Sequence, residues 1–383
     1  IVESSKANGA QAIIAINASP FHINKHEERI AVLKNHAKQF DVPLMYLNMI
    51  GGQDELVFDG DSLAVDRKAN VVVRAKLFEP DVIKVVLDGK DITSLHLAAP
   101  EKSSHAVTYK ALVTGVRDFV RQNGFTGVVI GLSGGVDSAL TLAIAVDALG
   151  AENVEAVMMP SRYTADISLQ DAEAEAALLG VKYDVVEIED VFESFLNTLA
   201  PVFDGAAADT TEENIQARCR GVLLMAISNK KGRMVLTTGN KSEMAVGYAT
   251  LYGDMCGGFA PIKDVCKTLV YKLCHYRNSV SPVIPERVIT RPPSAELRED
   301  QRDQDSLPDY DVLDRILELS VERDMPVDEI VAQGISREDV LHVITLVQRN
   351  EHKRRQSAPG IRVTRRAFGR DRRYPITSGY RRK

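Results

Sequence analysis

The fold of this chain is decided by the stretch Gly131-Leu132-Ser133-Gly134-Gly135-Val136-Asp137-Ser138. It follows the apolar run Val128-Val129-Ile130 and continues into an apolar segment at 139–145. This order predicts a strand, a glycine turn and a helix. Small residues let the backbone close around an anion, and the free amides at the start of the helix point at that anion. The hydroxyls of Ser133 and Ser138 add two further donors.

The charged residues in and next to this turn indicate which kind of anion it binds. No lysine follows the glycines, so the turn is not the Gly-x4-Gly-Lys-Ser/Thr loop of phosphoryl-transfer ATPases. Asp137 stands where that lysine charge would be. A carboxylate repels phosphates unless a cation lies between them, so the stretch predicts a nucleotide that binds together with Mg²⁺.

Strands and helices alternate after the turn. Apolar runs predict strands at 155–160, 183–188 and 234–238, and helices are expected at 168–179, from 190 and at 212–230. Ser168 is the expected cap of the first of these helices, and Gly180 its end. The alternation predicts an α/β fold in which a parallel sheet carries helices on both faces. Ligands bind beyond the carboxyl ends of such strands, so we expect 133–138, 159–163 and 238–243 to lie together.

The motifs resemble those of a known family. The Ser-Gly-Gly-x-Asp-Ser turn resembles the pyrophosphate loop of adenylating ATP-pyrophosphatases, which cleave ATP between its α and β phosphates. Together with residues 159–163, 213–220, 236–243, 248–254 and 295–297, it is similar to the synthetase domain of NAD+ synthetases. The resemblance spans nearly the whole chain. It implies an adenine nucleotide α-hydrolase-like, Rossmann-like synthetase domain.

The resemblance also implies three sets of site residues. ATP would be bound by residues 131–138 together with Thr238 and Lys267. The dinucleotide deamido-NAD+ would be bound by Asn214, Arg218, Glu243, His352 and Lys353. Mg²⁺ would be held by Asp137 and Glu243.

Taken alone, several of these residues have a simpler interpretation. Asn214 and Arg218 lie one helical turn apart and could form an exposed helix face. Glu243 could offset a helix dipole, and His352 alone is more typical of a surface or capping histidine.

The N-terminal part resembles a different domain. Asn-Ala-Ser-Pro-Phe at 17–21 and Gly-Gly-Gln-Asp-Glu-Leu-Val-Phe-Asp-Gly at 51–60 are similar to the later part of a nitrilase-type glutaminase domain, an α/β sandwich. The resemblance implies that Ser19 and Lys25 bind glutamine. Read alone, Ser19 could be a turn hydroxyl before proline and Lys25 a solvated helix lysine.

The glutaminase domains of this family use a Glu, a Lys and a nucleophilic Cys, because a thiolate attacks an amide better than a hydroxyl does. No residue of this chain matches any of the three, so no catalytic glutaminase residue is assigned. We expect a piece upstream of Ile1 to carry them. The predicted organisation is a partial glutaminase domain at 1–89, a linker at 90–105 and the synthetase domain at 106–383. The resemblance implies a homodimer or a larger homo-oligomer.

Composition sets limits on partners and compartment. The chain has 383 residues and a net charge of -6, which gives no reason to expect nucleic acid or a membrane as partner of the whole chain. It contains no run of about eighteen apolar residues that could span a bilayer. Its four cysteines form no metal-binding pair and are expected to stay reduced, in the cytoplasm. The Arg-rich segment after Lys353 could be a solvated tail, a binder of a polyanionic ligand or an RNA-binding element.

The predicted reaction is the ATP-dependent amidation of deamido-NAD+ to NAD+ through an adenylate, with release of AMP and pyrophosphate. Its nitrogen would come from ammonia, or from glutamine when the full glutaminase domain is present. Another amide-forming adenylating ligase, such as a GMP- or asparagine-synthesising enzyme, is the first alternative, although such enzymes have different glutaminase halves. An RNA-binding module or RNA thiolase is the second, although many thiolases need paired cysteines.

Overall fold

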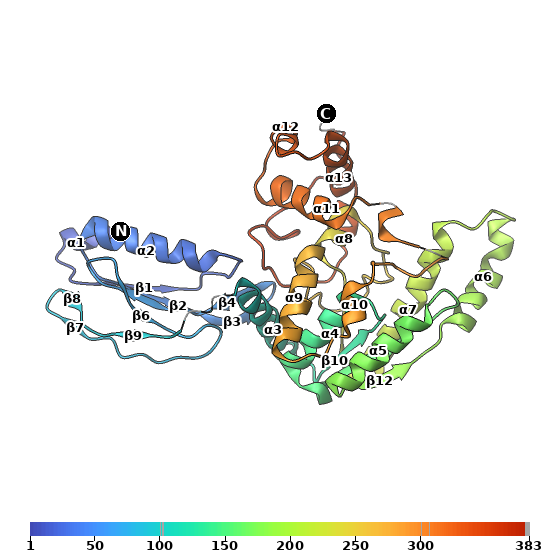
Figure 1. Ribbon diagram of the computed structural model, residues 1–383, viewed down its shortest axis with the longest axis horizontal. Coiled ribbons are helices and arrows are strands. Elements are labelled where there is room, and N and C mark those ends of the chain that lie inside the picture. The colour runs from blue at the N-terminus through green and yellow to red at the C-terminus, as the bar shows by residue number, and fades with distance from the viewer. Residues whose placement is uncertain (100, 102, 300, 306, 380–383) are drawn as a thin grey trace. The chain divides into compact units, whose positions relative to one another are not determined.

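The computed structural model describes residues 1–99, 101, 103–299, 301–305 and 307–379 of the chain. Contacts divide the chain into two compact units, Ile1–Asp118 and Phe119–Lys383, and the division falls inside helix α3 (Ser104–Gln122). Each unit has its own sheet, and Figure 1 labels the elements of both.

The first unit is built on a five-stranded mixed sheet in the order β1-β2-β5-β6-β9. Its β1 and β2 are parallel, whereas β5 is antiparallel to both β2 and β6. Before α3 it contains α1 (Val2–Ala7), β1 (Ile13–Asn17), α2 (Lys25–Phe40), β2 (Leu44–Asn48), β3 (Ile50–Gln53), β4 (Leu56–Asp59), β5 (Leu63–Val65), β6 (Val71–Arg74), β7 (Leu87–Asp88), β8 (Asp91–Ile92) and β9 (His96–Leu97).

Only one face of the β1–β2 part of this sheet is covered. Side chains alternate between the faces of a strand, and α2 packs Leu33 and Ala37 on the inner face against residues such as Leu44. On the other face Ile14 is 62% exposed and Ile16 is 83% exposed. An apolar sheet face normally packs against another layer, so this part of the unit presents an unpartnered surface.

The second unit is built on a four-stranded parallel sheet in the order β12-β11-β10-β13. Its sheet region contains β10 (Val128–Gly131), α4 (Val136–Leu149), a 3-10 turn (Ala151–Asn153), β11 (Val154–Met158), α5 (Asp166–Leu179), β12 (Lys182–Val185), α6 (Glu189–Phe203), α7 (Thr210–Lys231), β13 (Met234–Leu236), α8 (Lys241–Val246), α9 (Lys267–Val280) and α10 (Glu286–Thr290).

Helices cover both faces of this sheet. Val129, Val157 and Val235 pack against α6 and α7 in one cluster. On the other side, α4 contacts β10 and β11, and α5 contacts β11 and β12. All five residues of β11 are buried, as expected for a strand covered on both faces. This arrangement confirms the predicted α/β class.

A helical segment closes the second unit. It contains a 3-10 turn (Asp303–Asp305), α11 (Tyr310–Leu317), a π-helical turn (Glu318–Glu322), α12 (Val327–Val331), α13 (Arg337–Arg349) and α14 (Glu351–Arg354). These helices share an apolar core with α8 and with Phe368. Among the described residues, no helix has the length and apolar character needed to cross a bilayer.

Three local predictions need correction. Ser168 does not cap α5, which begins two residues earlier at Asp166, and its side chain is buried. The strand expected at 183–188 ends at Val185, because the chain then turns into α6. The segment after Lys353 is not a solvated tail over its first part, since Ile361 and Val363 are fully buried, whereas residues 375–379 are exposed.

Candidate functional site

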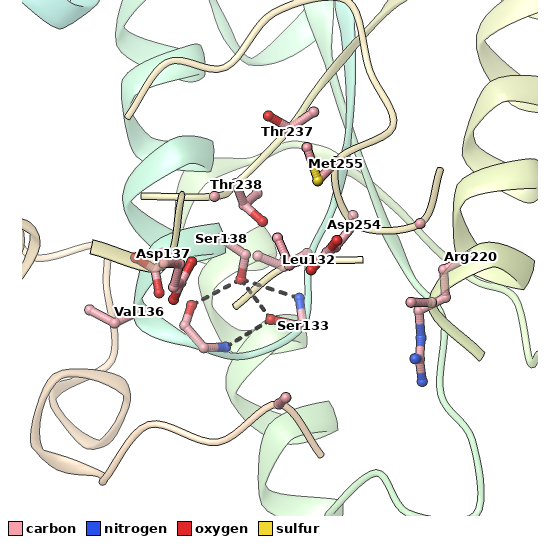
Figure 2. Close-up of a pocket in the computed structure, with 18 of the residues that line it drawn as sticks. Leu132, Ser133, Val136, Asp137, Ser138, Arg220, Thr237, Thr238, Asp254 and Met255 are labelled. Atoms are coloured by element: carbon pink, nitrogen blue, oxygen red, sulfur yellow. Dashed lines mark hydrogen bonds between the residues drawn. The ribbon is translucent and has the colours of Figure 1, made fainter. Parts of the chain in front are cut away.

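The glycine stretch forms a closed loop between β10 and α4. Ser138 Oγ donates to Gly135 O at 2.9 Å and accepts from Ser133 N at 3.2 Å, and the two serine hydroxyls lie 3.1 Å apart (Figure 2). The hydroxyls therefore hold the loop in shape. The first amides of α4 have no carbonyl partner within the helix, which leaves them for a bound anion.

Gly134 is required by the tightness of this loop. Its φ of +77° lies in the left-handed region, which glycine adopts without strain. A Cβ atom at this position would lie 2.4 Å from the carbonyl oxygen of Ser168, at the start of α5. The loop thus packs directly on α5, and any side chain at Gly134 would force the two apart.

The loop opens into a cavity of about 310 Å³ at the carboxyl ends of the parallel strands. The walls include residues 131–138, Met159 and residues 237–239. The structure therefore brings together the glycine turn and the segment after β13, as predicted. Of the expected segment 159–163, Met159 lines the cavity, and residues 160–163 lie outside the lining.

Three charged side chains meet on one wall of this cavity. The buried Lys267 Nζ forms ion pairs with Asp137 Oδ2 and, at 3.1 Å, with Glu243 Oε1. Asn240 Nδ2 donates to Asp137 Oδ1 at 2.9 Å, and its backbone amide donates to Glu243 Oε2 at 3.3 Å. Each of the four carboxylate oxygens on this wall thus has a hydrogen-bonding partner.

Burial shifts the protonation of this cluster. It raises the pKa of Glu243 to about 8; the Asp137 charge adds to this effect and Lys267 opposes it. Burial acts to lower the pKa of Lys267, but Asp137 and Glu243 outweigh it and raise that pKa well above its ordinary value. The wall therefore keeps a fixed ammonium between two acidic groups.

The donor chemistry of this wall fits Mg²⁺, with one condition. Mg²⁺ binds oxygen ligands and usually takes one or two carboxylates together with substrate phosphates and water. Asp137 and Glu243 would supply two such ligands. Each carboxylate oxygen has a second lone pair, but Lys267 Nζ lies between the two groups, so a bound Mg²⁺ would have to share them with it.

Of the residues expected to contact deamido-NAD+, Glu243 lines the cavity, whereas the other four lie outside its lining. Asn214 Oδ1 accepts a hydrogen bond from Thr250, and Arg218 Nε donates to Leu251 O. Lys353 Nζ donates to Gly247 O and Ala249 O, each at 2.8 Å.

These three side chains therefore converge on one segment, 247–251, which leads to the cavity-lining residues 253–256. Burial lowers the pKa of Lys353, an effect that the Asp254 charge opposes. His352 is exposed, and its Nδ1 lies 3.0 Å from the carbonyl oxygen of Arg349, the last residue of α13.

Ser19 and Lys25 belong to the first unit. Ser19 is part of a polar network in which its amide donates to Asn48 Oδ1 and its hydroxyl accepts from Arg29 Nε at 3.3 Å. Arg29 is itself buried and pairs with Asp59 at 2.7 Å. Lys25 lies at the start of α2 and pairs with Glu28 at 3.1 Å. The structure thus places Ser19 in a rigid setting and Lys25 on a partly exposed helix end.

Two parts of the cavity wall were missed by the sequence reasoning. Arg220, from α7, falls within the matching motif 213–220 and lines the cavity, although no role is predicted for it. Residues 291–297 form another wall, where Glu296 accepts a hydrogen bond from Ser168 Oγ at 2.7 Å. The only sequence signal for this wall was the presence of 295–297 among the matching motifs.

A parallel sheet with an anion-binding loop and a charged cavity at its carboxyl edge defines a nucleotide-binding α/β protein. A family model described as NAD synthase matches residues 108–357. A glutamine-dependent NAD(+) synthetase from Acinetobacter baylyi is 52% identical over 384 residues, covering 100% of this chain and 71% of that protein. The corresponding protein from Thermotoga maritima is 47% identical over 412 residues, covering 98% of this chain and 72% of the relative.

A solved structure agrees with these matches. The glutamine-dependent NAD+ synthetase from Acinetobacter baumannii, in complex with adenosine diphosphate, is similar with a TM-score of 0.73 at 48% identity. The match covers 99% of this chain and 70% of that chain. The chain belongs to the family of glutamine-dependent NAD+ synthetases, which are ligases. The predicted family is thereby confirmed, together with an NAD+ synthetase domain preceded by a partial nitrilase-like region.

Proposed function

We propose that this chain amidates deamido-NAD+ to NAD+ in two steps, in the cavity beyond β10. A nicotinate carboxylate is a poor electrophile, so it must be activated before ammonia can displace its oxygen. The observation that carries the proposal is the closed loop at 131–138, whose amides face the same cavity as the ion-paired Asp137, Lys267 and Glu243.

In the first step a carboxylate oxygen of deamido-NAD+ attacks the α-phosphorus of ATP. A carbon-bound oxygen becomes linked to phosphorus, and the bond from phosphorus to pyrophosphate breaks. The loop amides, Thr238 and the Lys267 ammonium are placed to offset the negative charge that gathers on the leaving pyrophosphate. Mg²⁺, held by Asp137 and Glu243, would supply further charge neutralisation.

In the second step ammonia attacks the acyl carbon of the adenylate. The carbon–oxygen bond to AMP breaks, and the extra proton of the amine is lost to solvent. This step needs no covalent bond to the protein, so positioning of the two substrates dominates its rate. We assign the dinucleotide to Asn214, Arg218, Glu243, His352 and Lys353. Three of these side chains contact the 247–251 segment beside the cavity.

We propose that glutamine is bound in the first unit, with Ser19 and Lys25 among its contacts. The chain contains no cysteine before Cys219, so this unit holds no thiol for a γ-glutamyl thioester. Glutamine use therefore needs a nucleophile from elsewhere, whereas free ammonia needs only the synthetase unit. We also propose the cytoplasm as the compartment, because all four cysteines are free thiols, and a homo-oligomer as the assembly.

The products distinguish this reaction from other uses of ATP. The protein is supplied with ATP, Mg²⁺, ammonium and deamido-NAD+, and the nucleotide products are separated by chromatography. The proposal expects NAD+, AMP and pyrophosphate in equal amounts. Formation of ADP and phosphate would show that ATP is cut at the wrong phosphate for an acyl adenylate.

A further inference from the structure

Arg220 presents a guanidinium with unused donors to the cavity. It extends from α7, and its Nε donates to the carbonyl of Met159, just after β11, at 2.9 Å. Its other two nitrogens make no hydrogen bond or ion pair with any residue that the structure describes. The side chain is partly buried, so four N–H donors remain in a setting with little water to satisfy them.

The other charged groups of the cavity do not neutralise Arg220. Lys267 pairs with Asp137 and Glu243, and Arg291 pairs with Glu296. The lining carboxylates Asp254 and Asp303 accept hydrogen bonds from Thr250 and Tyr310. Burial lowers the pKa of Arg220 to about 10, and the Glu296 charge offsets this only in part. Arg220 thus stays charged at neutral pH without a carboxylate of its own, and a buried cation of this kind is stabilised by a bound anion.

The position of Arg220 separates it from the acidic wall. In Figure 2 it lies on the far side of the loop from Asp137. It belongs to the α7 side of the sheet, where the side chains of Met159 and Leu224 both approach Gly131. An anion between the loop and Arg220 would therefore be held from two sides, by loop amides and by the guanidinium.

We infer that Arg220 binds an anionic oxygen of a substrate at the reacting end of the cavity, in addition to the residues that hold pyrophosphate. This inference rests on the proposed function, because it assumes that ATP and deamido-NAD+ meet here. Two substrate groups have the required chemistry: the α-phosphate of ATP, which stays on AMP, and the nicotinate carboxylate. A guanidinium pairs with either through two parallel N–H donors.

The test compares ligands that differ by one charged group. The affinities of AMP and adenosine, and of deamido-NAD+ and NAD+, are measured by titration calorimetry for the wild type, Arg220→Met and Arg220→Lys. A lost charge-assisted bond weakens binding roughly 10- to 100-fold. A selective loss for AMP over adenosine identifies the α-phosphate, and a selective loss for deamido-NAD+ over NAD+ identifies the carboxylate. Arg220→Lys should recover part of either loss.

Arg233→Met is the matched control. Arg233 also donates one hydrogen bond to a backbone carbonyl, Glu152 O, but it lies outside the cavity lining. Its removal should leave all four affinities within about twofold. Thermal unfolding of each variant verifies that it is folded.

Two results would overturn the inference. If Arg220→Met weakens charged and neutral ligands equally, Arg220 only supports the Met159 wall. If it changes none of the four affinities, Arg220 contacts no substrate anion. A wild-type protein that binds none of the four ligands would instead remove the proposed function on which the inference rests.

Discussion

Asp137 takes part both in the ion pairs of the cavity wall and in the proposed Mg²⁺ site. It lies in the first turn of α4, lines the cavity and accepts from both Asn240 and Lys267. Replacing its carboxylate by an amide keeps the size of the side chain and the Asn240 contact but removes the charge that pairs with Lys267. We therefore expect the role of Asp137 to depend on charge rather than on packing.

We expect Asp137→Asn to lower kcat for NAD+ formation by about 100-fold to 1000-fold, the loss typical of removing one electrostatic contact to a transition state. Asp147→Asn is the control, because Asp147 is also on α4 and pairs with Arg277, but it lies outside the cavity lining. The measurement is steady-state NAD+ formation with ammonium, together with the melting temperature. Turnover by Asp137→Asn at the wild-type rate would show that its carboxylate is not needed.

Glu175 is a buried acid that the mechanism does not use. It lies on α5 with no exposed surface, and neither carboxylate oxygen has a hydrogen-bond partner among the described residues. Burial raises its pKa well above the ordinary 4.5, and the Asp171 charge adds to this. The folded state therefore keeps a proton on Glu175 at pH values where the unfolded chain has lost it.

The sign of the pH effect follows from that proton. Above pH 4.5 the unfolded state is favoured increasingly, so the contribution of Glu175 to stability falls as pH rises, by up to about 1.4 kcal/mol per pH unit. We expect Glu175→Gln and Glu175→Leu each to reduce the loss of unfolding free energy between pH 5 and pH 8, measured with urea. Exposed Glu173→Gln should leave the loss unchanged. An identical pH dependence in all four proteins would mean that Glu175 ionises normally.

Among the contacts between secondary-structure elements, a buried lysine connects α8 to the C-terminal segment. Lys241 is fully buried and pairs with Asp264 at 2.9 Å and with Glu322 at 2.8 Å. Its ammonium also donates to Thr364 Oγ1 at 2.6 Å. Lys241 is the first residue of the helix that carries Glu243, so this network holds one wall of the cavity in place.

We expect Lys241→Met to destabilise the second unit by roughly 3–5 kcal/mol, because it leaves the buried Asp264 and the partly buried Glu322 without their cation. The exposed Lys230→Met, at the end of α7, should change stability by no more than about 0.5 kcal/mol. Urea unfolding of both variants checks this. A loss below about 1 kcal/mol for Lys241→Met would show that Asp264 and Glu322 find other partners.

Elements with strong local signals could be predicted from the sequence. The glycine turn joins a strand to a helix as predicted, and the helix expected at 212–230 is observed at Thr210–Lys231. The prediction that Ser168 caps a helix is wrong, because its hydroxyl donates a hydrogen bond to Glu296, which is 128 residues away in the chain. The position of Lys267 between Asp137 and Glu243 could not be predicted for the same reason. Local spacing carries no information about contacts between residues that are far apart in the sequence.

At the scale of the whole molecule, the C-terminal segment illustrates the same limit. The sequence shows a run of arginines, which on its own suggests a free basic surface. In the structure Arg354 is buried and pairs with Glu351, while Arg366 and Arg372 pair with Asp324. Among the described residues of this segment, Arg354, Arg355, Arg362, Arg366 and Arg372 are thus ion-paired within the chain. The predicted domain boundaries at 89 and 105 stay predictions.

We propose that the first unit decides whether glutamine can supply the nitrogen. No cysteine precedes Cys219, so this unit contains no thiol that could attack glutamine. We expect this chain alone to make NAD+ with ammonium and at least 100-fold more slowly with glutamine, measured as NAD+ formation in the same preparation. Addition of ammonium to the glutamine reaction is the control and should restore the rate. Efficient use of glutamine without it would contradict the assignment.

In the proposed reaction the nicotinate carboxylate attacks the α-phosphorus of ATP. If it does, the oxygen that bridges carbon and phosphorus leaves with AMP. Deamido-NAD+ labelled with ¹⁸O in its carboxylate is converted with ATP, Mg²⁺ and ammonium, and the AMP is analysed by mass spectrometry. The acyl adenylate predicts one ¹⁸O atom in each AMP formed. Unlabelled AMP, or label in phosphate released with ADP, would contradict it.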